Sequence, residues 1–414
     1  MLLFVEAGIA GTGLSCLRWA DDAGLDPALI AVDPTVYRDV PDGALLGDLA
    51  GRDRVFTAKD TDGDELDPGL LDWARSGGGP VGVVCVGDRN LPFAARLAEA
   101  LGAPFPSVDA VATFRDKRAA RRVYTELGIR SPRWTPAARA EEAVALWAEV
   151  GPVVLKNVKG AGSLDVLLCR TAEEVRAGHH ALATGGRYLD GELMAEEFVT
   201  GPLLSVETVV SAGRCAHLGV TDRQLGPRPH FCEVSYTFPV MAPPAARAEM
   251  ERAVEACVRH FGLTGFLHSE FILTAEGPVL VEINARLGGG LLALMMNDCL
   301  SVSSWELLCR SALGQPLRIP RHTGRYASAV TVYPDTAGTV ESVVDPGAVA
   351  ANPFVVDVVW NARPGDRVAP ATDYRGSVCQ VRTVAEAPAV AYNAALTAAR
   401  DVRINLVATG RRRG

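Results

Sequence analysis

Two glutamates face each other in the part of this 414-residue chain that is best suited to chemistry. Residues 266–274 and 279–283 are apolar and β-prone, which predicts two strands. A three-residue turn over 275–277 then places Glu270 opposite Glu282. Facing carboxylates repel each other, and Mg²⁺ offsets that repulsion because it prefers oxygen ligands. The pattern therefore predicts a metal site on a hairpin.

Asn284 and Arg286 share the strand face of Glu282, because side chains two positions apart point to the same side. Arg286 lies where a planar cation can clamp a phosphate or a developing oxyanion. The glycines at 288–290 let backbone come close to a ligand. The alternative is a surface hairpin with outward polar side chains, and strands this apolar argue against it.

Lysine is scarce in this chain. Of the 41 basic residues only four are lysines, namely Lys59, Lys117, Lys156 and Lys159. A lysine that persists against such a bias is more often one whose compact ammonium matters. Lys156 ends a predicted strand over 153–156, and the loop NVKGAGS over 157–163 follows it. This arrangement suits a phosphate, although a plain hairpin explains the loop alone equally well.

The first 110 residues alternate between strands and helices, which predicts a parallel α/β sheet. The expected strands cover 2–5, 29–32 and 81–86, and a helix covers 91–101 before Gly102. The glycines at 8, 11 and 13 do not match the G-x-G-x-x-G dinucleotide fingerprint.

The rest of the chain supplies further strands. Arg115-Asp116-Lys117 opens an amphipathic helix that ends near Leu127, before Gly128. Strands over 193–199 and 205–210 are expected, as an ordinary hairpin or as a junction whose backbone reads an adenine edge. After about 320 we expect strands over 327–333, 339–343, 355–360 and 402–407, and a helix over 385–399.

Composition is that of a globular protein, with 48% hydrophobic and 22% charged residues. A net charge of −8 argues against nucleic acid as a main partner. No apolar run is long enough to span a membrane, and no signal peptide is recognised. The nine scattered cysteines are typical of buried thiols, so we expect a cytoplasmic protein.

The order of these parts resembles the ATP-grasp superfamily of carboxylate–amine ligases, over nearly the whole chain. Within it the chain is similar to the L-amino acid ligases, the bacilysin-type dipeptide synthetases. The motifs His268-x-Glu270-Phe271 and Glu282-x-Asn284-x-Arg286-Leu287-Gly288-Gly289 carry most of that similarity. The segment PGDRV at 364–368, continuing through DYRG at 373–376, resembles the small C-terminal domain of that branch.

The resemblance implies an α/β (α+β ATP-grasp) fold in three parts. Residues 1–112 would form an N-terminal parallel α/β (pre-ATP-grasp) domain. Residues 113–318 would form the ATP-grasp domain, with a mobile lid subdomain at about 125–200. Residues 319–414 would form a small strand-rich C-terminal domain.

The resemblance also implies roles for individual residues. Mg²⁺, or alternatively Mn²⁺, would be held by Glu270, Glu282 and Asn284. Arg286, with Glu282 and Asn284, would be catalytic. Lys117 and Lys156 would contact the ATP phosphates, and further residues would form a lid loop and an adenine hinge. The whole nucleotide-binding set comprises Lys117, Lys156, Gly160, Gly162, Ser163, Glu196, Glu197, Phe198, Val199 and Glu207. The substrate set comprises Arg223 for a carboxylate, Glu233 for an amino group, and His268, Gly288 and Gly289. A solvated loop is the alternative for Arg223 and Glu233.

Three positions depart from the family pattern. Asn157 stands where a proline usually follows the lysine, and Asp165 replaces a glycine after the phosphate loop. Leu203 occupies the position that is often a ribose-binding glutamate, so Glu207 would take over that contact or the ribose would be held less tightly.

The expected function is ATP-dependent joining of a small acid, such as an amino acid, to an amine through an acyl phosphate. The products would be an amide or dipeptide, ADP and phosphate, in natural-product or small-peptide biosynthesis. The alternatives are a carboxylase-type ATP-grasp enzyme, a carrier-protein acyl ligase, or a non-catalytic nucleotide-binding regulator. The expected partners are small molecules, with no nucleic acid and no membrane. A homodimer and a carrier-bound substrate stay open.

Overall fold

The computed structural model describes residues 1–8, 12–63, 65–76, 79–186, 191–344 and 346–407, and Gly11 of the N-terminal glycine series lies outside them. A four-stranded parallel sheet comes first, in the order β3-β2-β1-β4. Its strands are β1 (Leu2–Val5), β2 (Pro27–Ala31), β3 (Val55–Thr57) and β4 (Gly82–Val84). The helices of this part are α1 (Thr12–Asp22), α2 (Leu45–Gly51), α3 (Pro68–Arg75) and α4 (Leu91–Leu101), with short 3₁₀ helices η1 (Pro34–Tyr37) and η2 (Asp88–Asn90).

The predicted parallel sheet is confirmed, and α4 has the predicted bounds. Gly102 ends α4 in the left-handed conformation, with φ of 66°. β3 was not predicted, because three residues are too few to show a periodic pattern.

Two helices lead from this sheet to the rest of the chain, namely α5 (Val108–Arg115) and α6 (Lys117–Glu126). Asp116 separates them because its carboxylate caps α6, accepting from the N–H groups of Arg118 at 2.9 Å and Ala119 at 3.1 Å. Arg115 and Lys117 therefore lie on either side of the break between the two helices.

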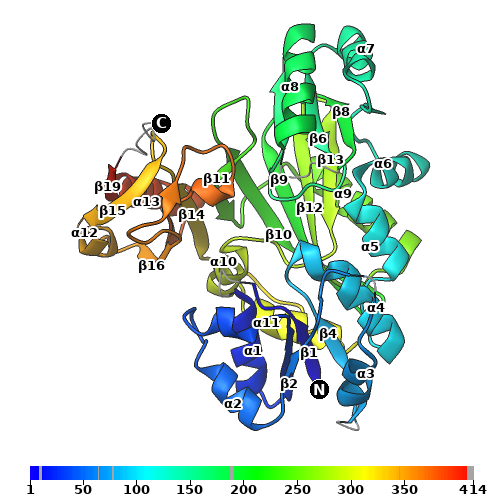
Figure 1. Ribbon diagram of the computed structural model, residues 1–414, viewed down its shortest axis with the longest axis vertical. Coiled ribbons are helices and arrows are strands. Elements are labelled where there is room, and N and C mark those ends of the chain that lie inside the picture. Colours follow the sequence, from blue (N-terminus) through cyan, green and yellow to red (C-terminus); the bar gives the residue numbers. More distant parts are fainter. Residues whose placement is uncertain (9–11, 64, 77–78, 187–190, 345, 408–414) are drawn as a thin grey trace, which may run out of the picture.

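A second, antiparallel sheet lies at the top of Figure 1, in the order β5-β8-β6-β7. Its strands are β5 (Trp134–Pro136), β6 (Val153–Asn157), β7 (Val166–Cys169) and β8 (Leu193–Glu197), and helices α7 (Ala140–Val150) and α8 (Ala172–Gly185) pack on it. This sheet with its two helices is called the lid sheet below.

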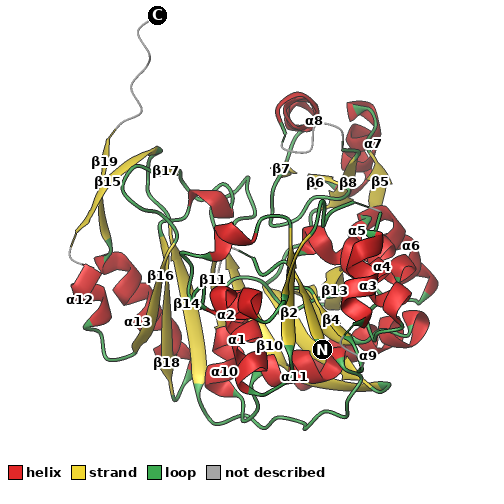
Figure 2. Ribbon diagram, turned by 60° about the horizontal axis from the view of Figure 1, so that its bottom comes forward, coloured by secondary structure: helices red, strands yellow, loops and turns green. Residues whose placement is uncertain are grey.

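An eight-stranded antiparallel sheet forms the centre, in the order β13-β12-β9-β10-β11-β14-β18-β16 (Figure 2). The strands are β9 (Leu203–Ser211), β10 (Arg214–Leu225), β11 (Glu233–Phe238), β12 (Gly265–Thr274), β13 (Gly277–Asn284), β14 (Tyr326–Val332), β16 (Val355–Trp360) and β18 (Cys379–Ala385). β8 and β9 belong to different sheets, so the hairpin, one of the two alternatives for these strands, is wrong. The segment between them instead connects the lid sheet to the centre.

The C-terminal strands extend the central sheet, because β14 pairs with β11. The remaining elements are α9 (Pro244–Phe261), α10 (Leu292–Cys299), α11 (Ser304–Ala312), α12 (Pro346–Ala350) and α13 (Pro388–Asp401), the 3₁₀ helix η3 (Tyr374–Gly376), and a small sheet of β15 (Gly338–Val344), β17 (Arg367–Val368) and β19 (Arg403–Val407). The predicted C-terminal strands are present. The strand β18 was not predicted. Because it extends to Ala385, the final helix begins at Pro388 and not at residue 385 as predicted. The predicted domain boundaries stay a prediction.

The glutamate hairpin has the predicted pairing for a different reason. The turn contains two residues rather than three, because Thr274 pairs with Gly277. A bulge between Glu270 and Phe271 in the pairing then shifts the register by one residue, and Glu270 lies opposite Glu282 as expected.

Hydrophobic packing fixes the parts relative to one another. One core joins Leu17 of α1 and Leu307 of α11 to Phe238 of β11. A second core packs Phe114 of α5 and Val254 of α9 against strands that include β12 and β13. Among the described residues, no helix is both long and apolar enough to cross a membrane.

The first testable consequence concerns the turn after β13. Gly290 has φ of 65°, and a Cβ there would lie 2.4 Å from the Tyr236 hydroxyl. That hydroxyl also accepts a hydrogen bond from the Leu291 N–H at 2.7 Å. Gly290→Ala should therefore lower the free energy of unfolding by about 2 kcal/mol, measured by urea denaturation.

Gly289→Ala is the matched control, since no atom lies within 4 Å of a Cβ at that position. Equal stability of the two variants would contradict the steric account.

Candidate functional site

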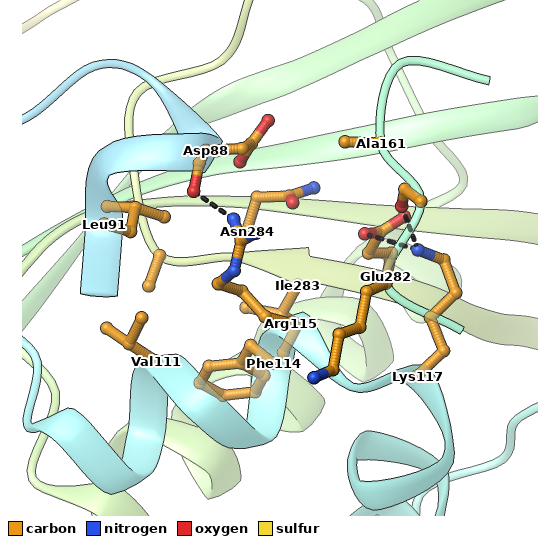
Figure 3. A pocket seen from close by; sticks show the side chains of 13 residues that line it. Asp88, Leu91, Val111, Phe114, Arg115, Lys117, Ala161, Glu282, Ile283 and Asn284 are labelled. Atoms are coloured by element: carbon orange, nitrogen blue, oxygen red, sulfur yellow. Dashed lines mark hydrogen bonds and ion pairs between the residues drawn. The ribbon is translucent and has the colours of Figure 1, made fainter. Parts of the chain in front are cut away.

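A cavity that is open to solvent lies where α5, α6, β13 and the loop after β6 meet (Figure 3). Its polar lining comes from four separate parts of the chain and comprises Asp88, Arg115, Lys117, Lys159, Gly160, Glu282 and Asn284. Predicted catalytic, metal and phosphate residues are thus brought to one place. Arg115 and Asp88 join them without having been predicted as site residues.

Lys117 is the cation at the centre of this cavity. Its Nζ donates to the Gly160 carbonyl oxygen at 2.5 Å and lies 3.6 Å from Glu282 Oε1. The residue is buried, with 8% of its surface exposed. Within the described part of the chain, Glu282 is the one carboxylate within 4 Å of this buried ammonium, which is therefore well placed to bind a further anion.

Lys156 lies in a separate buried group. Its Nζ is 2.5 Å from Glu196 Oε2, and Arg121 Nη2 is 2.8 Å from Glu196 Oε1 but outside hydrogen-bond geometry. Burial lowers the pKa of Lys156, because the charged form loses hydration. Burial opposes ionisation of Glu196 as well, but Arg121 and Lys156 outweigh it and lower the pKa of that carboxyl.

The predicted adenine hinge follows Glu196. The Glu196 side chain is occupied by the two cations, and the N–H groups of Glu197 and Phe198 donate to the carbonyl oxygens of Arg133 at 2.8 Å and Pro152 at 2.9 Å. The Glu196 carboxylate and these two N–H groups are therefore already occupied and are not free to bind adenine. Adenine recognition by Glu196, Glu197, Phe198 and Val199 stays a prediction.

The loop after β6 has an unusual backbone. Gly162, Ser163 and Asp165 have φ values of 65°, 58° and 57°, and the last two are strained for residues that carry a Cβ. Asn157 is buried, and its Nδ2 has no hydrogen-bond partner among the described residues. A buried donor without a partner beside a glycine loop fits a phosphate-bearing ligand.

The predicted metal ligands lie in two different environments. Glu282 and Asn284 line the cavity, whereas the Glu270 carboxylate is bound by Arg223 Nη1 at 2.9 Å and lies 3.2 Å from His268 Nε2. The described residues include no group of three or more His, Cys, Asp or Glu side chains placed to hold a metal. Glu282, Asn284 and the facing Glu270 fit a Mg²⁺ ion that arrives with phosphate oxygens.

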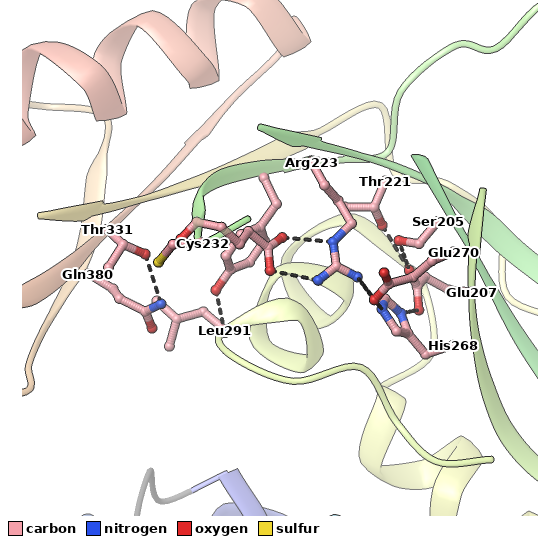
Figure 4. A network of polar contacts seen from close by, with 12 residues as sticks. Ser205, Glu207, Thr221, Arg223, Cys232, His268, Glu270, Leu291, Thr331 and Gln380 are labelled. Atoms are coloured by element: carbon pink, nitrogen blue, oxygen red, sulfur yellow. Dashed lines mark hydrogen bonds and ion pairs between the residues drawn. The ribbon is translucent and has the colours of Figure 1, made fainter. Parts of the chain in front are cut away.

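Arg223 and His268 lie within a polar network that runs along the central sheet (Figure 4). Arg223 binds Glu233 through two hydrogen bonds, of 2.8 Å from Nε and 2.6 Å from Nη2. The predicted substrate partners for a carboxylate and an amino group therefore bind each other, and a substrate would have to share or exchange this contact.

Glu207 holds His268 from the other side. It is 1% exposed and accepts from Ser205 at 2.7 Å and Thr221 at 3.1 Å, while His268 Nδ1 lies 2.9 Å away. Burial lowers the pKa of His268, but the Glu207 carboxylate outweighs burial and raises it to about 9. Ribose binding by Glu207 stays a prediction that requires these contacts to be exchanged.

The repulsion between His268 and Arg223 is offset by their neighbours. Arg223 Nη1 approaches His268 Nε2 closely, which is unfavourable for two cations. Three carboxylates, those of Glu207, Glu233 and Glu270, surround the pair and hold both charges. The same neighbours keep the pKa of Glu270 well below its usual range, although burial acts in the opposite direction.

The glycines after β13 contact the protein's own side chains. A Cβ at Gly288 would lie 2.5 Å from Leu292 Cδ2 and 3.0 Å from His268 Nδ1. Gly288 is therefore required for packing on the predicted substrate residue, whereas Gly289 has open space around it. Ligand contact by either glycine stays a prediction.

Arg286 binds Asp88 of η2. Asp88 lines the cavity with Glu282 and Asn284, whereas the predicted catalytic Arg286 lines a second cavity beside β4. Sequence reasoning missed Asp88, although one signal was available. Asp88 follows the third predicted strand, and ligands of open parallel sheets bind at the carboxyl ends of the strands.

Comparison with known proteins agrees with this geometry. Residues 114–290 match the ATP-grasp domain family, and residues 330–407 match the family of L-amino acid ligase C-terminal domain 2. An L-amino acid ligase from Bacillus licheniformis shares the fold with a TM-score of 0.78, at 19% identity and over 98% of each chain.

Two relatives found by sequence share a higher percentage of identical residues with this chain than that structure does. An uncharacterized protein, y4rH, from Sinorhizobium fredii is 29% identical over 87% of this chain and 74% of its own length. A D-alanine–D-alanine ligase from Cupriavidus taiwanensis is 28% identical over 46% of this chain and 61% of its own length. Both family matches confirm the resemblance inferred from the sequence motifs. Residues 114–290 thus form a domain of the ATP-grasp family, and residues 330–407 form a C-terminal domain of the L-amino acid ligase type.

Proposed function

We propose that this protein is a peptide-type ligase that uses ATP to join a small carboxylic acid to an amine, through an acyl phosphate, with release of ADP and phosphate. The observation that carries the proposal is the cavity in which Lys117, Glu282 and Asn284 converge with the glycine loop. Cations and a carboxylate in one small space, beside a glycine-containing loop, suit the end of a triphosphate chain.

The nucleotide and its metal fit the residues present. ATP with Mg²⁺, or Mn²⁺, would supply the phosphoryl group that turns a carboxylate into a better electrophile. Lys117 would bind phosphate oxygens directly in the cavity, and Lys156 would do so after a shift from Glu196. Glu282 and Asn284, with Glu270 on the facing strand, would hold the metal.

The remaining residues position the reacting groups. The loop over 157–163 lies above the cavity, with Gly160 and Ala161 in its wall, so it would exclude water from the reaction. Arg286 is a fixed cation that would stabilise charge on the carbonyl group under attack. Arg223, Glu233 and His268 offer charges of both signs, which suits an amino acid substrate with an ammonium and a carboxylate. The names of the ligase relatives, D-alanine–D-alanine and L-amino acid, support the same substrate class.

The reaction type gives the second prediction. The enzyme should be incubated with Mg-ATP, an amine and an amino acid whose carboxylate carries ¹⁸O. One ¹⁸O should appear in inorganic phosphate for each ADP formed, because the carboxylate oxygen leaves with the phosphoryl group.

Omission of the amino acid serves as the control and should abolish the label. Label in AMP would show adenylation and overturn the proposal. Phosphate release that depends on bicarbonate in place of the amino acid would indicate a carboxylase-type reaction.

The third prediction concerns the metal. Glu282→Gln removes a charge from the cavity but keeps the shape of the side chain, so turnover should be lost while the circular dichroism spectrum is unchanged. The measurement is phosphate release as a function of Mg²⁺ concentration.

Glu276→Gln is the matched control, since Glu276 lies in the exposed turn of the same hairpin and should keep its activity. Near-normal activity of Glu282→Gln would end the metal assignment.

The fourth prediction concerns the lysines. Lys156 is 6% exposed and binds Glu196, whose other carboxylate oxygen faces Arg121. A forked guanidinium therefore has no room at this position. Lys156→Arg should lower kcat/KM for ATP by about 10–100-fold. Lys59 is exposed, and Lys59→Arg should leave the value unchanged. Equal behaviour of the two variants would contradict a phosphate role for Lys156.

A further inference from the structure

Arg286 is held by a residue from the N-terminal sheet. Its Nε lies 2.5 Å from Asp88 Oδ1, and its Nη2 lies 2.5 Å from Asp88 Oδ2. The two residues are 198 positions apart in the chain. Only 12% of the Arg286 side chain and 25% of the Asp88 side chain are exposed. A bidentate pair of this kind fixes the plane of the guanidinium as well as its position.

The pair leaves part of the guanidinium unused. An arginine has five N–H donors, and Asp88 takes one from Nε and one from Nη2. Nη1 donates once to the Leu287 carbonyl oxygen, at 2.8 Å. One N–H on Nη1 and one on Nη2 therefore have no hydrogen-bond partner within the described part of the chain, and such donors suit the oxygens of a carboxylate or phosphate.

Asp88 itself stands on a rigid base. Its own carbonyl oxygen accepts from Arg115, and Cys85 Sγ donates to the Gly87 carbonyl oxygen at 3.4 Å. Asn90 Nδ2, two residues after Asp88, donates to the Thr61 carbonyl oxygen at 3.1 Å. η2 is thus tied to neighbouring segments on both sides of Asp88.

The charges in the pair favour its ionised form. Burial raises the pKa of Asp88, but Arg286 outweighs burial and lowers that pKa below its usual value. Both partners are therefore charged at neutral pH. Removing the Asp88 charge would leave a buried guanidinium with no carboxylate in direct contact, free to turn toward other oxygens.

We propose that Asp88 is the positioning residue for Arg286, so that the N-terminal sheet completes the active site of the ATP-grasp domain. Asp88 holds Nε and Nη2 of the guanidinium, and the remaining N–H donors would bind the reacting carbonyl or phosphoryl oxygens. This inference rests on the proposed ligase function and adds a residue to it. Asp88 also lines the cavity, and the double-mutant cycle below separates an effect through Arg286 from a direct one.

The test begins with Asp88→Asn, which keeps the shape and one acceptor oxygen but removes the charge. We expect kcat to fall on the order of 10–100-fold, because a displacement of about 1 Å in a catalytic group has that effect. The dissociation constant of ATP, titrated with a fluorescent nucleotide, should stay within about twofold, because the lysines and the hinge are untouched. A crystal structure of the variant should show the guanidinium displaced.

Asp26→Asn is the matched control. Asp26 makes a bidentate pair with Arg54 in the same N-terminal part, at 2.7 and 3.1 Å, outside the residues that line the cavity. That variant should keep wild-type kcat. A wild-type kcat in Asp88→Asn, or a kcat above wild type, would overturn the proposal, and the latter would show that Asp88 restrains Arg286.

A double-mutant cycle separates positioning from general damage to the fold. Arg286→Ala should lower kcat, and adding Asp88→Asn to that variant should lower it no further. A further loss of kcat in the double variant would show that Asp88 acts by another route. Failure of the wild-type protein with every acid and amine pair would instead reject the ligase function, which is a different outcome from an active enzyme indifferent to Asp88.

Discussion

Electrostatic balance around two facing carboxylates is the constraint on which the site depends. Glu270 and Glu282 lie opposite each other across β12 and β13, and their charges are not hydrated as they would be on an open surface. The fold surrounds them with cations from distant segments. Lys117 approaches Glu282 and Arg223 approaches Glu270, so the two carboxylates are divided between a cavity and a polar network. A metal ion and a nucleotide would change this balance together, because one adds positive charge and the other adds negative charge.

The elements that bring these charges together are set by local features. Asp116 breaks the chain between α5 and α6, and so directs Lys117 into the cavity. The bulge in the β12–β13 pairing keeps the glutamates opposite each other although the turn is short. The positive φ angles of Gly162 and Ser163 curl the loop after β6 back over the cavity. Each feature costs local stability or regularity, and each serves the placement of a charged group.

Much of this arrangement was readable from the sequence, because strong periodicity and glycine placement determine local structure. The parallel sheet, α4, the hairpin pairing and the resemblance to the ATP-grasp family were predicted correctly. Contacts between distant segments were not readable. Asp88 meets Arg286 across 198 residues, and no local pattern encodes that meeting. β8 and β9 look like a hairpin in the sequence until their partners in the two sheets are known.

The continuity of the central sheet has a consequence for the integrity of the chain. β14 covers the outer side of β11 through four backbone pairings, from Ser235 with Val330 to Phe238 with Ala327. A protein cut before Tyr326 would lose β14, β18 and β16 together, and the peptide groups of the six-residue strand β11 would face water along an unpaired edge. Such an edge recruits strands from other molecules. The C-terminal region thus acts as a cap against self-association, in addition to any part that it plays beside the substrate.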